Sequence, residues 1–277
     1  MIARLKTWVA VALLALAGCG ADDGERQDSL QLIRERGHLI AGVFTDKPPF
    51  GYVDEQGDYV GYDTDLARHL AKRLLGDESK VEFVAVDPAS RVPMLQSGKV
   101  DLILANMTVT PERAGVVDFT YPNLQVAVQA LVRDDSGIER FADLAGRTVI
   151  VTSGTTADLW LTQNHPQMNL LKYERTSLSL QALADGRGDA YVQDNIVLYG
   201  WTKQHPGYRV LDDQLGGVAP VAPAVRKGNL VLRDWLNGEL QAMTREGVML
   251  KLYDRYLRSQ LPDDMDPQLL LMDASAE

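Results

Sequence analysis

One segment of this chain places a hydroxyl and a guanidinium on a short turn behind a buried strand. Thr108 and Arg113 lie five positions apart, directly after the apolar residues 100–105. A planar guanidinium can hold a carboxylate by two parallel hydrogen bonds, and free backbone amides beside it add further donors. Thr110 is expected to cap a helix that begins at Pro111, which fixes the turn. The segment therefore predicts a binding site for a small carboxylate.

A second turn offers further donors for an anion. The residues Ser153-Gly154-Thr155-Thr156 follow a β-branched strand, 148–152, and open a predicted helix. Free amides at the start of a helix attract anions, although such a turn can equally be an ordinary cap. A free amino acid carries a carboxylate and an ammonium on one carbon, and each needs an opposite charge and aligned hydrogen bonds when it leaves water. The chain offers cations, amide donors and carboxylates for such a ligand.

Alternating strands and helices position these turns. This βαβ order predicts mostly parallel sheets flanked by helices. The rhythm restarts near Leu131, and the extended segments 121–128 and 217–225 are candidates for crossings between two lobes. Two α/β lobes are therefore favoured over a single domain. Hydrophobic spacing predicts helices over 30–36, 65–75, 92–97, 157–164, 179–184, 230–243 and 248–259, and strands over 38–43, 81–86, 100–105, 148–152 and 190–193.

The start of the chain has the pattern of an export signal. Two basic residues precede the apolar run 8–17, which is too short to span a hydrocarbon core of ~30 Å. Small residues precede Cys19, the only cysteine, so the motif resembles a lipobox in which that cysteine is diacylated. We expect 1–19 to be a lipoprotein signal peptide, 20–28 a flexible tether, and the protein to be anchored to the membrane in the cell envelope. A stray cysteine in an ordinary signal peptide is the alternative.

The composition is that of a soluble globular protein. The 277 residues are 45% hydrophobic and 24% charged, with a formal net charge of −10. Nucleic acid is an unsuitable partner for this acidic chain, because proteins bind nucleic acid through basic surfaces. The four histidines lack metal-ligand spacing, and no phosphate-binding GxxxxGK[ST] loop occurs. No metal or cofactor is expected.

The segment 97–123 closely resembles the carboxylate-binding segment of the bacterial extracellular solute-binding proteins, family 3, which deliver polar amino acids to ABC importers. The stretches DKPPFGY, GDYVGYDTDLA, VTSGTTA and DAYVQDN fit that family in the same order, so the resemblance spans roughly 37–257. It implies the two-lobed type II periplasmic-binding fold, each lobe a mostly parallel sheet flanked by helices, with two hinge strands. The expected divisions are 29–123 and 226–260 for lobe 1, 128–217 for lobe 2, 124–127 and 218–225 for the hinge strands, and 261–277 for a C-terminal tail.

In lobe 1 the resemblance implies that Arg113 holds the ligand carboxylate. Thr108 matches a hydroxyl that hydrogen-bonds the ligand, and Asn106 matches another lining position. A surface arginine would be the ordinary alternative for Arg113.

In lobe 2 the resemblance implies a complementary half-site. Thr156 would complete the carboxylate clamp through its amide and hydroxyl, with Ser153 and Thr155 in support. Asp194, which follows the strand 190–193, would pair with the ligand ammonium. A lone aspartate after a strand is otherwise most often a turn or cap residue.

Two cations favour an acidic ligand. Arg91 resembles the arginine of an NR-x-P motif in relatives that bind glutamate and aspartate, and Lys47 could add a second positive charge near the ligand side chain. The asparagine of that motif is Ser90 here, and Phe44 and Thr176 stand where some acidic-ligand relatives have arginine and histidine. We therefore expect Glu or Asp as ligand, with Gln or Asn as the nearest competitors.

The expected function is capture of this amino acid between the lobes by a monomeric protein, which delivers it to an ABC permease with a separate ATPase subunit. One alternative is an enzyme on the same fold, resembling cyclohexadienyl or arogenate dehydratases. Such chemistry needs a general acid or base, and Ala157 occupies a place where an acid could have stood. Another alternative is a ligand-sensing subunit of a membrane receptor.

Overall fold

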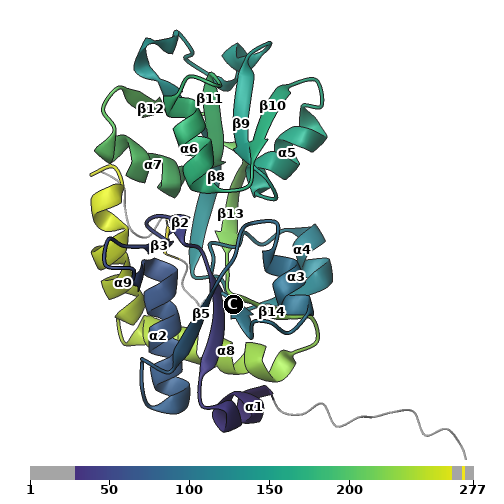
Figure 1. Cartoon of the computed structure of the whole chain (residues 1–277), viewed down its shortest axis with the longest axis vertical. Coiled ribbons are helices and arrows are strands. Elements are labelled where there is room, and N and C mark those ends of the chain that lie inside the picture. Colours follow the sequence, from purple (N-terminus) through teal and green to yellow (C-terminus); the bar gives the residue numbers. More distant parts are fainter. Residues whose placement is uncertain (1–28, 264–269, 272–277) are drawn as a thin grey trace, which may run out of the picture.

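The computed structural model describes residues 29–263 and 270–271, which form two α/β lobes stacked end to end (Figure 1). Cys19 and the expected signal peptide and tether lie outside the described residues. Each lobe is built on its own sheet, with the strand order β5-β1-β6-β14-β7 in lobe 1 and β10-β9-β11-β8-β12 in lobe 2. The predicted two-lobed type II architecture is confirmed.

Lobe 1 combines parallel strands from the first half of the chain with antiparallel strands at one side. β1 pairs in parallel with β5 and β6, whereas β14 runs antiparallel to both β6 and β7. The last long helices return to this lobe and pack on its core through residues such as Leu236 and Leu252. Its elements are α1 (Ser29–Arg36), β1 (Leu39–Val43), α2 (Tyr62–Leu75), β5 (Val81–Ala85), α3 (Arg91–Gln96), β6 (Leu102–Ile103), α4 (Pro111–Val116), β7 (Val117–Phe119), β14 (Ala224–Arg226), α8 (Leu230–Arg245), α9 (Val248–Tyr256) and η3 (Arg258–Gln260).

Lobe 2 repeats the strand-helix rhythm. Its strands β9, β10 and β11 are parallel, and helices α5, α6 and α7 follow them in the chain. The strands are rich in β-branched residues because both faces of the sheet are covered, and Val149, Ile150 and Val151 are fully buried. Its elements are η1 (Asp134–Ser136), η2 (Phe141–Leu144), β9 (Thr148–Thr152), α5 (Thr156–Asn164), β10 (Asn169–Tyr173), α6 (Thr176–Ala184), β11 (Ala190–Asp194), α7 (Asn195–Gln204) and β12 (Tyr208–Val210).

Two strands carry the chain between the lobes. β8 (Leu124–Arg133) leaves lobe 1 and continues into the sheet of lobe 2, and β13 (Leu215–Val221) returns beside it. They pair antiparallel from Leu124↔Val221 to Val128↔Leu215, with an irregularity between Leu215 and Val218. Both predicted crossings are therefore strands of one ladder. Leu270 and Leu271, in the expected tail, lie against this ladder, since Gln125 N donates to Leu270 O at 2.9 Å.

Several short elements differ from the sequence prediction. The loop after β1 contains β2 (Asp46–Lys47) and β3 (Gly51–Val53), which join β4 (Tyr59–Val60) in a small antiparallel sheet. Helix α2 begins at Tyr62 rather than at residue 65, because Tyr62 N and Asp63 N donate to the carbonyls of Pro49 and Phe50 and so join the helix start to this sheet.

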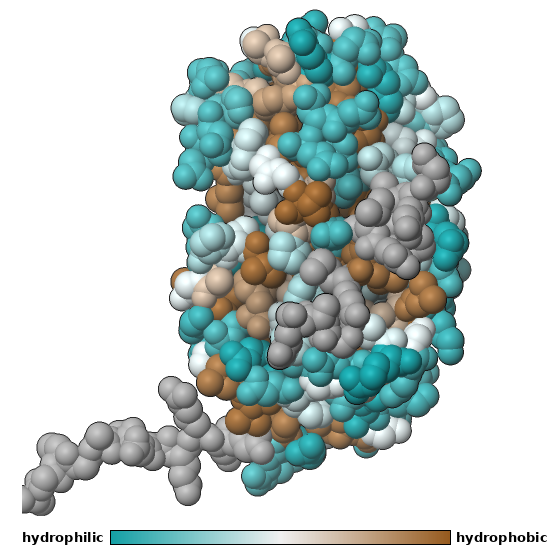
Figure 2. All heavy atoms as spheres, turned by 180° about the vertical axis from the view of Figure 1, so that it is seen from behind, coloured by the Kyte–Doolittle hydropathy of each residue, from teal (hydrophilic) through white to brown (hydrophobic). Residues whose placement is uncertain are grey.

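The outer surface is largely hydrophilic. Figure 2 shows hydrophilic residues over much of both lobes on the face seen from behind, with smaller hydrophobic areas between them. Within residues 29–263 and 270–271, no helix is both long and apolar enough to cross a bilayer.

Candidate ligand-binding site

Arg113 connects the two lobes. It lies in the first turn of α4, where Thr110 caps the helix as predicted by accepting a hydrogen bond from Arg113 N at 3.3 Å. Its Nη1 donates to Thr108 O at 2.8 Å within lobe 1, and its Nη2 donates to Gly154 O of lobe 2 at 3.1 Å. Thr156 Oγ1 is 3.5 Å from Nη1. The guanidinium therefore lies where the segments predicted to bind a carboxylate meet.

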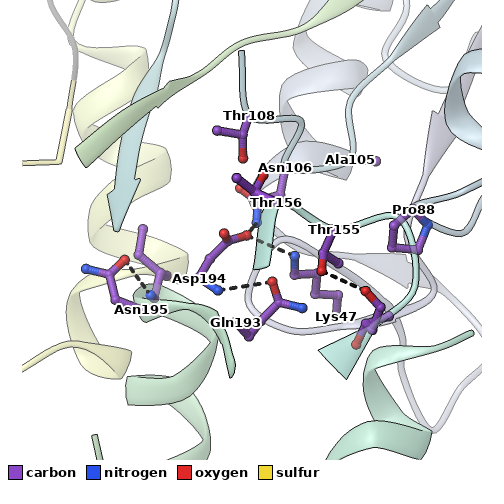
Figure 3. Close-up of polar contacts among 12 residues, drawn as sticks. Lys47, Pro88, Ala105, Asn106, Thr108, Thr155, Thr156, Gln193, Asp194 and Asn195 are labelled. Atoms are coloured by element: carbon purple, nitrogen blue, oxygen red, sulfur yellow. Dashed lines mark hydrogen bonds and ion pairs between the residues drawn. The ribbon is translucent and has the colours of Figure 1, made fainter. Parts of the chain in front are cut away.

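Asp194 lies at the carboxyl end of β11 and faces lobe 1. Its Oδ2 accepts hydrogen bonds from Lys47 Nζ at 3.1 Å and from Asn106 Nδ2 at 2.7 Å (Figure 3). Lys47 and Asn106 are buried, with relative exposures of 2% and 3%. Gln193 Oε1 accepts a hydrogen bond from Asp194 N at 3.0 Å and helps to fix the end of the strand. One carboxylate of lobe 2 thus receives two donors from lobe 1.

The turn between β9 and α5 is shaped by capping. Thr155 is the N-cap of α5: its hydroxyl accepts from Asp158 N and donates to Thr152 O at 2.7 Å. Ser153 N donates to Tyr173 O at 2.8 Å, which ties the turn to β10. These contacts lie within lobe 2, and the supporting roles of Ser153 and Thr155 in ligand binding stay predictions. Thr156 is the first helical residue, and its hydroxyl points toward Arg113.

Lys47 and Arg91 flank one aromatic ring. Lys47 Nζ lies 5.2 Å and the Arg91 guanidinium carbon 5.4 Å from the centroid of Phe44, distances at which a cation is attracted to the ring. Arg91 is 3% exposed, and its Nη1 donates to Ala105 O at 2.8 Å and to Asn106 O at 3.3 Å. Its Nε donates to Pro88 O at 3.2 Å. Arg91 therefore contacts the backbone beneath the cleft, and its predicted contact with a ligand side chain stays a prediction.

Sequence reasoning did not single out Asp63, which lies just before the helix predicted over 65–75. Asp63 Oδ2 accepts from Asn106 N at 2.8 Å, and the side chain is 3% exposed. Burial raises its pKa to about 7, against the opposing effects of the Asn106 hydrogen bond and of Lys47 and Arg91. The available signal was its place in GDYVGYDTDLA, a stretch that resembles the family.

Five buried charged side chains lie where the lobes meet. Three buried cations, Lys47, Arg91 and Arg113, interact with two buried carboxylates, Asp63 and Asp194. Burial lowers the pKa of each of the three cations, and Asp194 opposes that shift in all three.

No group of three or more histidine, cysteine or acidic side chains among the described residues is arranged to hold a metal ion. The cleft combines a guanidinium, helix-start amides and a carboxylate, which together can accept a zwitterion.

Comparison with known proteins gives a consistent result. The family described as bacterial extracellular solute-binding proteins, family 3, matches residues 39–259. The chain is 38% identical over 230 residues to a glutamine-binding protein of Geobacillus stearothermophilus, covering 75% of this chain and 88% of that protein.

Solved structures agree with this match. A solute receptor for L-cysteine of Neisseria gonorrhoeae is 44% identical with a TM-score of 0.86, covering 88% of this chain and 99% of that one. An ancestral amino-acid-binding protein, a precursor of cyclohexadienyl dehydratase, is 35% identical with a TM-score of 0.76, covering 83% and 99%. This chain belongs to the bacterial extracellular solute-binding proteins, family 3.

Proposed function

We propose that this protein captures a polar L-amino acid between its lobes and delivers it to the permease of an ABC importer that has a separate ATPase subunit. The observation that supports this most directly is that Arg113 of lobe 1 donates to Gly154 O of lobe 2 at 3.1 Å, while Asp194 of lobe 2 accepts from Lys47 and Asn106 of lobe 1 at 3.1 Å and 2.7 Å. Arg113, with Thr108 and Thr156, holds the ligand carboxylate. Asp194 holds the ligand ammonium.

The ligand carries an acidic side chain, and Glu or Asp is our first choice. Lys47 is a cation buried where the lobes meet, beside Asp194, and a ligand carboxylate near it compensates its charge. An uncompensated buried charge costs several kcal/mol, so this cation discriminates between acidic and uncharged ligands. L-cysteine is a second candidate because the receptor from Neisseria gonorrhoeae named for it is 44% identical, and ionisation of its thiol would also add a negative charge.

The protein acts as a binder and not as an enzyme. A dehydratase would need a positioned general acid or base, and Asp194 and Arg113 are both required to hold the zwitterion. We further propose that it is a monomer, that it acts in the cell envelope, and that a lipid on Cys19 anchors it to the membrane.

A thermal-shift screen with the twenty amino acids, followed by calorimetry, tests this function because a ligand that binds only the folded chain raises its melting temperature. Arg113→Ala should weaken binding by about 2–4 kcal/mol, since it leaves a desolvated carboxylate without its partner. Asp194→Asn should weaken it comparably, and the exposed Arg34→Ala serves as the control. Unchanged affinity in both cleft variants, or no binding of any amino acid to the wild-type chain, would refute the proposal.

A further inference from the structure

Asn106 has an unusual backbone conformation. Its φ is +43°, the only positive φ at a non-glycine position among the described residues. A left-handed conformation costs an ordinary L-residue roughly 1–2 kcal/mol, although asparagine tolerates it better than most. Such a conformation persists where the surroundings hold it in place.

Two buried, oppositely charged side chains hold this backbone. Asp63 Oδ2 accepts from Asn106 N at 2.8 Å, and Arg91 Nη1 donates to the carbonyls of Ala105 and Asn106 at 2.8 Å and 3.3 Å. One side chain therefore binds the amide and the other binds the carbonyls of the same short segment. Both are 3% exposed, so water competes little for these charge-assisted bonds.

The result of this arrangement is a side-chain amide directed across the cleft. Asn106 Nδ2 donates to Asp194 Oδ2 at 2.7 Å. The opposite amide orientation would place an oxygen against the carboxylate, which fixes the assignment of the nitrogen and the oxygen. Asn106 Oδ1 is then a buried acceptor without a hydrogen-bond partner among the described residues. A buried, unmet acceptor costs about 1–3 kcal/mol, and a donor supplied by a ligand would recover it.

We propose that the side-chain carbonyl of Asn106 accepts a hydrogen bond from the ligand ammonium beside Asp194, and that Arg91 and Asp63 are positioning residues that act through the 105–106 backbone. This inference rests on the proposed function, because it assumes an amino acid in the cleft. Asp194 Oδ2 already receives two donors from the protein. The ammonium therefore donates to Asp194 Oδ1 and to the side-chain oxygen Oδ1 of Asn106, and these two acceptors share its N–H groups.

The proposal changes what Arg91 is expected to do. A direct contact with an acidic ligand side chain would make loss of Arg91 more harmful for glutamate than for glutamine. A positioning role predicts equal losses for both, because each ligand presents the same ammonium to Asn106.

The acceptor role is tested by Asn106→Gly, since glycine adopts a positive φ without strain and removes the whole side chain, that is, the Oδ1 acceptor together with the Nδ2 donor to Asp194. Calorimetry would compare L-glutamate, L-glutamine and L-cysteine with their N,N-dimethyl derivatives, which retain the charge but keep only one N–H, too few for both Asp194 and Asn106. The factor by which this methylation weakens binding is called the N-methyl ratio. We expect methylation to weaken binding to the wild-type chain about tenfold and to Asn106→Gly about twofold or less. Equal ratios in the two proteins would overturn the acceptor role while leaving the proposed function intact.

The positioning role is tested by a double-mutant cycle. Arg91→Met should weaken glutamate and glutamine binding equally, by about tenfold in the wild-type background and about twofold or less in Asn106→Gly, where no side chain remains to be positioned. Asp63→Asn keeps an acceptor for Asn106 N and should leave the N-methyl ratio unchanged.

The positioning role would be overturned if Arg91→Met weakened binding equally in the wild-type and Asn106→Gly backgrounds, or if it weakened glutamate binding more than glutamine binding. If Arg91→Met does not fold, Asp63→Leu replaces it, because leucine offers no acceptor to Asn106 N. The N-methyl ratio of Asp63→Leu should fall toward that of Asn106→Gly. An unchanged ratio would overturn the positioning role.

Discussion

The charged side chains between the lobes bind specific partners because they are buried, and not because of their residue type alone. Exposed arginines and lysines form weak, screened pairs, whereas Lys47, Arg91 and Arg113 are at least nine-tenths buried and bind specific oxygens. Burying these charges is costly, and each charge is offset by charge-assisted hydrogen bonds. For Asp63 the burial outweighs the Asn106 hydrogen bond and the nearby cations, and raises the pKa of the carboxyl to about 7.

This raised pKa predicts a pH-dependent effect of Asp63→Asn. Below about pH 4 the folded and unfolded chains both bind the proton, so the carboxyl adds no penalty. As the pH rises towards 7, the Asp63 carboxyl is ionised in the unfolded chain but still protonated in the folded chain, so the free energy of unfolding falls. Above pH 7 the folded chain also ionises, and the loss of unfolding free energy is complete at roughly 4 kcal/mol. Thermal unfolding should therefore show Asp63→Asn gaining more over wild type at pH 8 than at pH 4.

The control for this pH series is Glu55→Gln, which removes an exposed carboxylate and leaves the buried residues around Asp63 unchanged. A gain for Asp63→Asn that is the same at pH 4 and pH 8 would contradict the assignment of a raised pKa to this carboxyl.

At the residue scale, the sequence singled out Arg113 and Asp194, which contact the opposite lobe, but it did not predict their partners there. Thr108, Arg113 and Asp194 follow strands, and the ends of strands determine their location. The partners of Arg91 could not be predicted, because the carbonyls of Ala105 and Asn106 come near it only through the tertiary path of the chain. The unmet Asn106 oxygen depends in turn on a backbone φ that residue type does not specify.

Longer elements were predictable because they are periodic, and very short ones were not. Helices α2, α8 and α9 carry repeating hydrophobic residues on one face, which is a strong signal. Strands β2 and β4 have two residues each and carry no period of their own. The irregularity in β13 is also an element-scale feature, since two adjacent glycines, Gly216 and Gly217, have φ values of +75° and +79°.

These two glycines form a matched pair for mutation. A Cβ on Gly216 would lie 2.9 Å from Trp160 Nε1 of α5, whereas one on Gly217 meets nothing within 4 Å. Both alanine variants should lose about 1 kcal/mol of unfolding free energy because of the positive φ. Gly216→Ala should also displace Trp160, shift the start of α5 with Thr156, and weaken ligand binding several-fold in calorimetry.

Gly217→Ala is the internal control, because it carries the same backbone strain without the contact with Trp160. Equal affinities of the two variants would show that the position of α5 is independent of this crossing strand.

At the scale of the whole molecule, polar contacts away from the candidate ligand contacts also hold the lobes together. Asp46 Oδ2 of lobe 1 accepts from both Ser177 N and Ser177 Oγ in the first turn of α6, each at 2.9 Å. Arg175 of lobe 2 lies 3.3 Å from Thr45 Oγ1 and 3.5 Å from Asp87 Oδ1. A ligand that binds only between closed lobes gains affinity from every contact that stabilises closure.

Asp46→Ala should therefore weaken amino-acid binding without removing any group proposed to contact the ligand. The carboxylate supplies a charge-assisted bond to a free helix amide and interacts favourably with the helix N-terminus. Because these groups are partly exposed, we expect a loss of about 1 kcal/mol, or roughly fivefold in Kd by calorimetry. Asp54→Ala is the matched control, since Asp54 accepts from Gln56 N and Asp58 N within its own lobe. Equal affinities of Asp46→Ala and wild type, or an equal loss in Asp54→Ala, would show that this contact does not contribute to closure.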